Sequence, residues 1–486
     1  MNATAPASPP LYDGPPGGKP ERRDFRDDLA TADEQGRRQW VYARQPQGRF
    51  YQRRIYLSWL LLGILFVNPW VRINGNPLLM LNVATGRFSI LGRIFWPQDM
   101  ALLAIALLLF FTGIMIFTAA YGRLWCGWVC PQTLFMEMVF RRIEYKIEGD
   151  SRAQRALAAA PWTGRKIGLK LAKQAIFFGL SFVISNLLLS YVIGRDQLLG
   201  IITDSPSRHL TGLAYLLAFT GVFYAIFARF REQACTFICP YGRFQSTVID
   251  ENTVVVAYDH QRGEQRARWD RRQSLAERRQ ARHGDCVDCG RCVSVCPTDI
   301  DIRNGIQMEC IHCTVCMDAC DGVMEKLGRP RGLIRYASLN SIERGEPFRV
   351  TPRMWGYGAV LAVLIGLFLF LVLTRPNVEA TLLRTPGDLF EQTPNGDLVN
   401  LYTVQLVNKT SRPIPVELKL ENVAGTLSIM GNPKPVVAGE QMLETSILIE
   451  MPAEMLRGGP KKFDVGVYSE GRLMQRVHTT FIGPRN

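Results

Sequence analysis

The sequence has no cysteine outside four short patterned groups. Its 486 residues include twelve cysteines, and every one belongs to such a group. None is left over for an isolated structural disulfide, which favours a reducing compartment for all the cysteine-bearing segments. The start of the chain also lacks the cationic and apolar leader of a secreted protein. Residues 1–54, rich in Pro and Gly and then in charge, are expected to be a flexible cytoplasmic tail.

Acidic residues are in deficit. The chain has 57 Lys and Arg against 43 Asp and Glu, a net charge of +14. In a soluble protein this excess would favour nucleic-acid binding, but here the basic residues lie beside long apolar runs, as in membrane proteins. The Arg-rich stretch 262–282 has almost no interleaved aromatic residue. We therefore expect no nucleic-acid partner, and we interpret this stretch as a solvated helix near anionic lipid headgroups.

Five apolar stretches are long enough to cross about 30 Å of hydrocarbon. They are Ile55–Ile73, Met100–Tyr121, Leu169–Ile193, Leu210–Phe230 and Met354–Thr374. Lys and Arg gather before the first stretch, between the second and third, and after the fourth, so these parts are expected inside the cell. The N-terminus and the segment between the fourth and fifth stretches should then be cytoplasmic. The part beyond the fifth should be periplasmic.

Eight cysteines form two runs with the spacing of iron–sulfur proteins. The runs are Cys286, Cys289, Cys292 and Cys296, and then Cys310, Cys313, Cys316 and Cys320. In two-cluster ferredoxins, three thiolates of one run hold a [4Fe–4S] cube and the fourth reaches the other cube. We expect one cluster at Cys286, Cys289, Cys292 and Cys320, and a second at Cys310, Cys313, Cys316 and Cys296. Zinc, the alternative, favours paired Cys-x-x-Cys knuckles with a longer gap.

The other four cysteines form two matching Cys-x-x-x-Cys-Pro motifs. They are Cys126 with Cys130, and Cys235 with Cys239. Each motif follows a predicted span that runs from outside to inside, so both should emerge at one membrane face. Residues i and i+4 share a helix face, and the proline disfavours helix at the second cysteine. Four sulfurs could therefore converge between two helix ends.

Such a sulfur site suits a soft metal. Thiolates prefer Cu(I), zinc or iron, and the flanking Arg123, Arg231 and Arg243 are expected to lower the thiol pKa. A redox-active dithiol is a second interpretation, and packing of small buried residues at helix ends is a third. His312, inside the second cysteine run, is expected to tune its cluster rather than to ligate it.

These features predict a multi-pass α-helical membrane protein with a cytoplasmic two-cluster ferredoxin-like insert and a C-terminal immunoglobulin-like sandwich. The predicted parts are the tail 1–54, the membrane domain 55–230 with four spans, the ferredoxin-type domain 231–352, the fifth span 353–375 and the periplasmic sandwich 376–486. The sandwich is predicted from period-two alternation in Leu401–Val407, Val416–Leu420 and Ser446–Glu450, with Pro, Gly and Asn between such segments.

The order of spans, Cys-Pro motifs, two-cluster insert and sandwich resembles the CcoG (FixG, RdxA) family of accessory proteins for cbb3-type cytochrome c oxidase. The resemblance runs from about Phe50 to the end, although Cys320 is followed by Asp321 rather than by proline. It implies a bacterial inner-membrane protein that reduces Cu(II) to Cu(I) for the copper site of the oxidase. The candidate copper-reducing or copper-binding thiols would be Cys126, Cys130, Cys235 and Cys239. The implied partners are the lipid bilayer, oxidase subunits, copper chaperones or a copper transporter, a cytoplasmic electron donor and a second copy of the chain.

Two other functions fit the same residues. The chain could oxidise quinol or pass electrons to a partner without copper chemistry, and a quinone-dependent redox change of the clusters would then occur without copper. It could also be a non-catalytic assembly scaffold that acts through the sandwich. In that case oxidase maturation would survive loss of the eight cluster cysteines.

Overall fold

The structure is a computed structural model of the whole chain. It describes residues 31, 35 and 37–482, apart from 74, 83–85, 97–98, 271–274, 386–389, 395, 411 and 457–459. Most of the expected tail 1–54 lies outside the described residues. The chain divides into two compact units. The first contains Met1–Val67, Ala106–Ser190 and Arg195–Ile365, and the second contains Asn68–Ile105, Tyr191–Gly194 and Gly366–Asn486.

Four helices in the described part of the chain are long and apolar enough to cross a membrane. They are α2 (Met100–Tyr121), α7 (Gly164–Ile193), α9 (Leu210–Ala225) with its π-helical continuation η5 (Ile226–Phe230), and α16 (Pro352–Leu373). These helices coincide with four of the five predicted spans, although α7 begins five residues before the expected start at Leu169. No residue of α16 is buried, as expected for a helix that faces lipid. The chain is a multi-pass α-helical membrane protein.

The first predicted span differs from the structure. Helix α1 runs from Arg49 to Val67, and it is not among the helices that meet the length and hydropathy requirements in the described residues. Its first two turns carry Arg49, Arg53 and Arg54. The helix ends six residues before the predicted end because Pro69 follows Asn68, and the residue before a proline avoids helical conformation. A 3₁₀ turn, η1 (Asn68–Trp70), takes its place.

Short helices connect the apolar ones in the first unit. They are α3 (Leu124–Trp128), α4 (Pro131–Thr133), the π-helical turn η3 (Leu134–Phe140), α5 (Arg141–Glu148), α6 (Ser151–Ala159), α8 (Arg195–Thr203), η4 (Pro206–Arg208), the π-helical turn η6 (Ala234–Ile238) and α10 (Pro240–Val248). Aromatic rings join η3 to the apolar helices, since Phe140 of η3 stacks on Phe227 with ring centroids 4.8 Å apart and also packs edge-on against Phe177 of α7.

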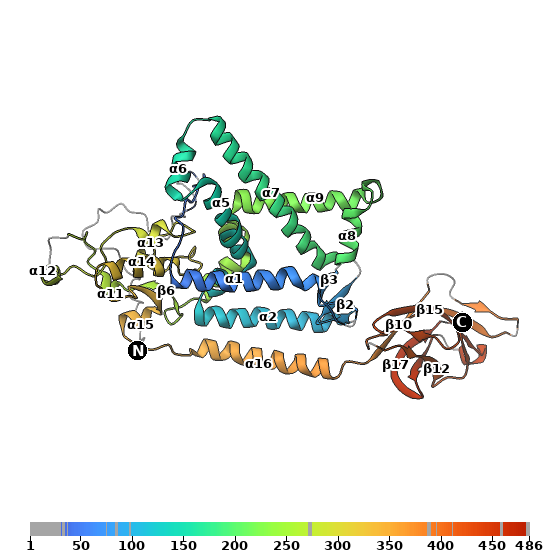
Figure 1. The fold of residues 1–486 in the computed structure, drawn as a ribbon. Helices are drawn as coiled ribbons and strands as arrows, with labels where there is room; N and C mark the ends of the chain where they lie inside the picture. The colour runs from blue at the N-terminus through green and yellow to red at the C-terminus, as the bar shows by residue number, and fades with distance from the viewer. Residues whose placement is uncertain are drawn as a thin grey trace, which may run out of the picture. The chain divides into compact units, whose positions relative to one another are not determined.

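The ferredoxin-type part is built from short elements around the cysteine runs. They are β6 (Val255–Tyr258), α11 (His260–Gly263), α12 (Leu275–Gln280), α13 (Arg291–Ser294), η7 (Ile302–Asn304), α14 (Val315–Lys326), β7 (Ile334–Ala337) and α15 (Leu339–Glu343). Strands β6 and β7 pair antiparallel. Figure 1 shows these elements gathered beside the start of α1, and α14 contacts α1 directly. The cysteine runs thus lie where α1 begins.

The C-terminal part is the all-β sandwich that the alternation predicted. Its strands are β8 (Val378–Arg384), β9 (Glu391–Gln392), β10 (Leu398–Asn408), β11 (Ile414–Pro415), β12 (Glu417–Glu421), β13 (Thr426–Ile429), β14 (Val436–Val437), β15 (Met442–Met451), β16 (Lys461–Ser469) and β17 (Arg472–Phe481), with the 3₁₀ turn η8 (Ala453–Leu456). One antiparallel sheet has the order β13-β15-β10-β8, with β9 also beside β10, and another has the order β12-β16-β17. Tyr402, Val404 and Leu406 of β10 alternate into the core and meet Phe463 and Val465 of β16.

A small set of strands before α2 was not predicted. They are β1 (Arg72–Ile73), β2 (Asn76–Pro77), β3 (Leu79–Asn82), β4 (Arg87–Ile90) and β5 (Arg93–Phe95). Asp99, which follows them, is buried and accepts hydrogen bonds from Arg375 (2.6 Å) and Lys409 (2.6 Å). Lys409 also pairs with Glu379 of β8. This buried charge cluster holds the segment before α2 against the sandwich within the second unit.

Candidate redox centre

The structure brings the eight run cysteines into two groups. Cys320 of α14 lies beside the first run: burial, and then the nearby thiols of Cys292, Cys286 and Cys289, raise the pKa of Cys320 to about 12. A second group forms around Cys316, whose pKa is raised by burial and then by Cys313, Cys310 and Cys296. The fourth cysteine of each run therefore lies with the first three of the other run.

These groups fit an iron–sulfur cluster in their donor chemistry. All eight thiols are free, and a cavity of about 20 Å³ is lined by Cys296, Cys310, Cys313 and Cys316 together with Cys292 of the first group. Within the described ranges, no group of three or more His, Cys, Asp and Glu side chains is arranged to hold a single metal ion. A cube differs from a single ion in this respect, because each thiolate binds a different iron.

The two groups differ in their access to solvent. Cys289 is exposed, whereas Cys310, Cys313 and Cys316 are all buried. The first group therefore presents an edge to solvent at Cys289, whereas the second group has three buried thiols and the half-buried Cys296.

The first Cys-Pro motif packs directly on the loop of the second group. Gly127, next to Cys126, lies so close to this loop that a Cβ would collide with the backbone carbonyl oxygen of Ile311 and come within 3.0 Å of the backbone nitrogen of Cys313. Cys126 itself packs against the apolar cluster that contains Ile311, Cys313 and Val315. Glycine at position 127 is thus a geometric requirement of this contact.

Polar contacts reinforce the same junction. The backbone N–H of Arg123 donates to Nδ1 of His312 at 3.0 Å, and the guanidinium of Arg123 donates to Oε1 of Gln245 at 2.8 Å and to the carbonyl of Met308. The thiol of Cys126 donates to the same Oε1 of Gln245 at 3.3 Å. Burial, and then the charge of Arg123, lower the pKa of His312 to about 3, so the ring is neutral and can accept this bond.

The four Cys-Pro thiols lie close enough to influence one another. Burial, followed by the thiols of Cys130, Cys126 and Cys239, raises the pKa of Cys235 to about 12. Burial also raises the pKa of Cys126. The charge of Arg123 opposes this rise but does not cancel it. The expected lowering of thiol pKa by flanking arginines is therefore wrong for these two thiols, because desolvation of a thiolate outweighs one nearby charge.

The other two flanking arginines are engaged elsewhere. Arg231 donates two hydrogen bonds to Glu144, at 3.2 and 2.9 Å, and Lys173 of α7 binds the same carboxylate. Although burial alone would raise the pKa of Glu144, Arg231 and then Lys173 lower it to about 2. Arg243 is exposed and donates to the carbonyl of Phe237. The charge of Arg231 is thus neutralised within a buried ion-pair network.

Local backbone geometry marks both motifs. The π-helical turn η3 follows the first motif, and the π-helical turn η6 contains Cys235. Cys130 (φ −57°, ψ 124°) and Cys239 (φ −72°, ψ 110°) are both outside the helical conformation before their prolines, as the sequence predicted for the second cysteine of each motif. π-Helical turns inside α-helices occur often at functional sites, which is consistent with a functional role for these thiols.

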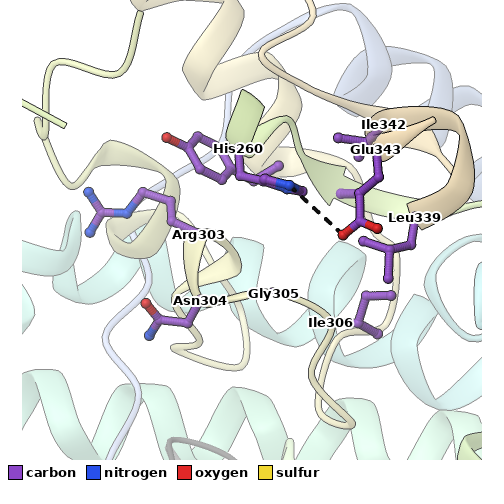
Figure 2. A pocket seen from close by; sticks show the side chains of 10 residues that line it. His260, Arg303, Asn304, Gly305, Ile306, Leu339, Ile342 and Glu343 are labelled. Carbon is purple, nitrogen blue, oxygen red and sulfur yellow. Dashed lines mark ion pairs between the residues drawn. The ribbon is translucent and has the colours of Figure 1, made fainter. Parts of the chain in front are cut away.

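A larger cavity lies away from the thiols. It has a volume of about 60 Å³ and lies between β6, η7 and α15. Figure 2 shows His260 facing Glu343, with Nε2 and Oε1 4.0 Å apart, while Arg303 and Asn304 line another side. No cysteine lines it. We therefore place the candidate site at the cysteine groups.

Three family models match the chain. A 4Fe-4S dicluster domain matches residues 230–339, a 4Fe-4S binding domain matches residues 103–170, and an Ig-like fold at the C-terminus of FixG matches residues 368–484. The first match includes all eight run cysteines together with Cys235 and Cys239. The second includes only Cys126 and Cys130. These matches show iron–sulfur binding and the Ig-like fold of the C-terminal part.

Similar proteins cover most of the chain. Nitrogen fixation protein FixG of Rhizobium meliloti is 33% identical over 435 residues, which are 81% of this chain and 82% of that protein. Protein RdxA of Cereibacter sphaeroides is 33% identical over 403 residues, covering 79% and 83% respectively. A crystal structure of a FixG-related protein from Vibrio parahaemolyticus covers 22% of this chain and 95% of its own, with 18% identity and a TM-score of 0.20.

Proposed function

Since the chain belongs to the FixG/RdxA family and is an iron–sulfur membrane protein, we propose that it reduces Cu(II) to Cu(I) for assembly of the copper site of a cbb3-type cytochrome c oxidase. The observation that carries this proposal is the contact between Cys126 and the loop of Cys310 and Cys313. It joins an electron-carrying region to a second, all-sulfur site on the same side of the protein.

The cluster ligands are part of the proposal. Cys286, Cys289, Cys292 and Cys320 would hold one [4Fe–4S] cluster, and Cys310, Cys313, Cys316 and Cys296 the second. When bound, these clusters supply one-electron transfer at low potential. The exposed Cys289 marks the edge where a cytoplasmic one-electron donor would approach.

The substrate would bind at Cys126, Cys130, Cys235 and Cys239, whose thiols would draw together around the copper, because no three ligands among the described residues stand ready for a single ion. Each Cu(II) takes up one electron and becomes Cu(I), while the thiol sulfurs keep their oxidation state. Soft thiolate ligands favour Cu(I), so this site lowers the free energy of the product. Because burial raises the pKa of Cys126 and Cys235, metal binding must release protons there. The Cu(I) would pass to a transporter, a copper chaperone or an oxidase subunit.

Membrane orientation also belongs to the proposal. The N-terminus and the cysteine groups would be cytoplasmic and the sandwich periplasmic, in a bacterial inner membrane, because the basic residues gather beside the parts assigned to the inside. Reporter fusions after Val67, after Gly164 and after Leu373 test this orientation. If the reporter fused after Val67 is located in the cytoplasm, α1 does not cross the membrane.

The enzymatic test uses the purified full-length protein, reduced anaerobically and mixed with Cu(II) and a Cu(I)-specific chelator. We expect the double variant Cys126→Ala, Cys235→Ala to lose most of the rate while retaining its iron. Thr236→Ala, which removes a hydroxyl from the same motif, is the matched control and should keep the rate. Equal rates in the wild type and the double variant would exclude these thiols, and electron transfer without copper would then be the better account.

A further inference from the structure

One buried arginine near the second cysteine group has guanidinium donors without a partner. The side chain of Arg54 is 1% exposed, and neither its Nε nor its Nη2 has a hydrogen-bond partner among the described residues. A buried cation without compensation is strongly unfavourable, so such groups are normally paired or bound to an anion. The position of Arg54 therefore calls for a negatively charged neighbour.

Helix α1 fixes where this guanidinium lies. The backbone N–H groups of Phe50 and Tyr51, in the first turn, donate to the carboxylate of Asp318 at 3.1 and 2.8 Å. Asp318 lies in α14 between Cys316 and Cys320. Arg54 comes one turn after these contacts, so α1 is held with Arg54 facing the second cysteine group.

The surroundings of Cys313 agree with this placement. Tyr51 and Ile55, on either side of Arg54 in the sequence, pack in one apolar cluster with Cys313. The guanidinium of Arg54 lies close enough to the Cys313 sulfur for its charge to act on that thiol and oppose the rise in pKa that burial causes. Arg54 is thus a cation within reach of this cysteine.

We propose that Arg54 binds the iron–sulfur cluster of Cys310, Cys313, Cys316 and Cys296 and raises its reduction potential. A cube with four thiolates carries net negative charge, and cluster potentials depend on net charge and on hydrogen bonds to the sulfurs. The guanidinium offers a fixed positive charge and a rigid fork of N–H donors, and both stabilise the reduced, more negative form. This inference rests on the proposed cluster ligands and not on copper chemistry.

A second buried arginine shows what a purely structural role looks like. Arg278 is also 1% exposed and lies near Cys286 of the first group. Its Nε donates to the carbonyl of Gly284, and its other nitrogens donate to the carbonyls of Ala267, Arg268 and Cys286. The donors of Arg278 are therefore used by the backbone, whereas Nε and Nη2 of Arg54 remain available.

The test is a redox titration of the full-length protein followed by EPR, with iron counted in each sample. In Arg54→Gln we expect the reduced fraction of one cluster to fall at least tenfold at a given potential, a shift of 59 mV for a one-electron couple. The other cluster should be unchanged. Arg54→Lys, which keeps the charge but loses the fork, should restore most of the potential and shift the g-values of that cluster. Arg53→Gln, an exposed charge change on the same helix, is the matched control and should leave both clusters unchanged.

Either arm can overturn the proposal. Unchanged potentials in an iron-replete Arg54→Gln protein would exclude a role for Arg54 at the cluster. If Arg54→Gln fails to retain iron, Arg54→Lys decides, because an unaltered potential and EPR spectrum in the lysine variant would show that the N–H fork is not used. Failure of copper reduction would leave these measurements intact, since no copper is added. Absence of iron from the wild type would instead refute the cluster ligands.

Discussion

The two Cys-x-x-x-Cys-Pro motifs are alike in sequence but differ in their surroundings. In the first, Gly127 follows Cys126 and allows the backbone to pack on Ile311 and Cys313. In the second, the equivalent position is Thr236, and the next two residues, Phe237 and Ile238, are 41% and 60% exposed. Under the proposed function, the first motif would face the electron source. The second would face the lipid or an incoming partner.

The largest expected effect concerns thiol reactivity in the second motif. The thiolate is the reactive form, and a pKa of about 12 at Cys235 leaves its thiolate fraction at neutral pH about a thousandfold below that of an ordinary thiol. Alkylation of Cys235 in the metal-free protein should therefore rise about tenfold per pH unit well beyond pH 9. Mass spectrometry of pulse-alkylated protein measures this, with unfolded protein as the control. A plateau near pH 9 would show that Cys235 is not desolvated.

Exchanging the residue after the first cysteine of each motif tests the packing difference. Gly127→Thr should destabilise the junction by about 1–3 kcal/mol, because the new side chain collides with the Ile311 carbonyl. The reciprocal Thr236→Gly should cost only about 0.5–1 kcal/mol, through added chain flexibility in a helix. Denaturation of the detergent-solubilised protein, followed through cluster absorbance, compares the two. Equal losses would mean that the motifs pack alike.

A smaller loss is expected when the polar contact at the junction is removed. His312→Ala leaves the buried N–H of Arg123 without its acceptor and should cost about 1–2 kcal/mol. His312→Asn can place an oxygen where Nδ1 lies and should recover part of that loss. The same denaturation measurement applies. No recovery by asparagine would show that the imidazole acts through packing rather than through this hydrogen bond.

The smallest effect is expected at the exposed side of the second motif. Phe237→Ser should change the unfolding free energy in detergent by less than about 0.5 kcal/mol, because Phe237 is partly exposed and is not in any buried apolar cluster of the described residues. It should lower partitioning into lipid bilayers, since it removes apolar surface. Thermal unfolding and flotation with liposomes separate the two effects. A large loss of stability would show that this face is packed inside the protein.

Local patterns predicted most of the fold. Period-two alternation predicted β10, β12 and β15, and long apolar runs predicted four helices. Contacts between distant segments could not be predicted this way. The collision that excludes a side chain at Gly127 depends on Ile311, far along the chain, although a small residue at that position was a usable signal.

The end of α1, the strands before α2 and the thiol pKa values were not predicted correctly, because in each case the local signal was weak or was opposed by a stronger effect. Pro69 ended α1 inside an apolar run that hydropathy alone extended to Ile73. Strands β3 to β5 are only three or four residues long, too short for alternation to be recognised. Arginines near thiols suggested a lowered pKa, but desolvation was stronger at Cys126 and Cys235. Burial, which decides such balances, is a property of the folded chain.

The hydrogen bonds from the first turn of α1 to the carboxylate of Asp318 have a consequence for biosynthesis. Helix α1 leaves the ribosome early, but the carboxylate that caps its first turn lies 267 residues after Tyr51. These two hydrogen bonds therefore cannot form until translation has passed Asp318. Because Asp318 lies only two residues before Cys320, the last of the run cysteines, this end of α1 is capped only after nearly all of those cysteines have been made.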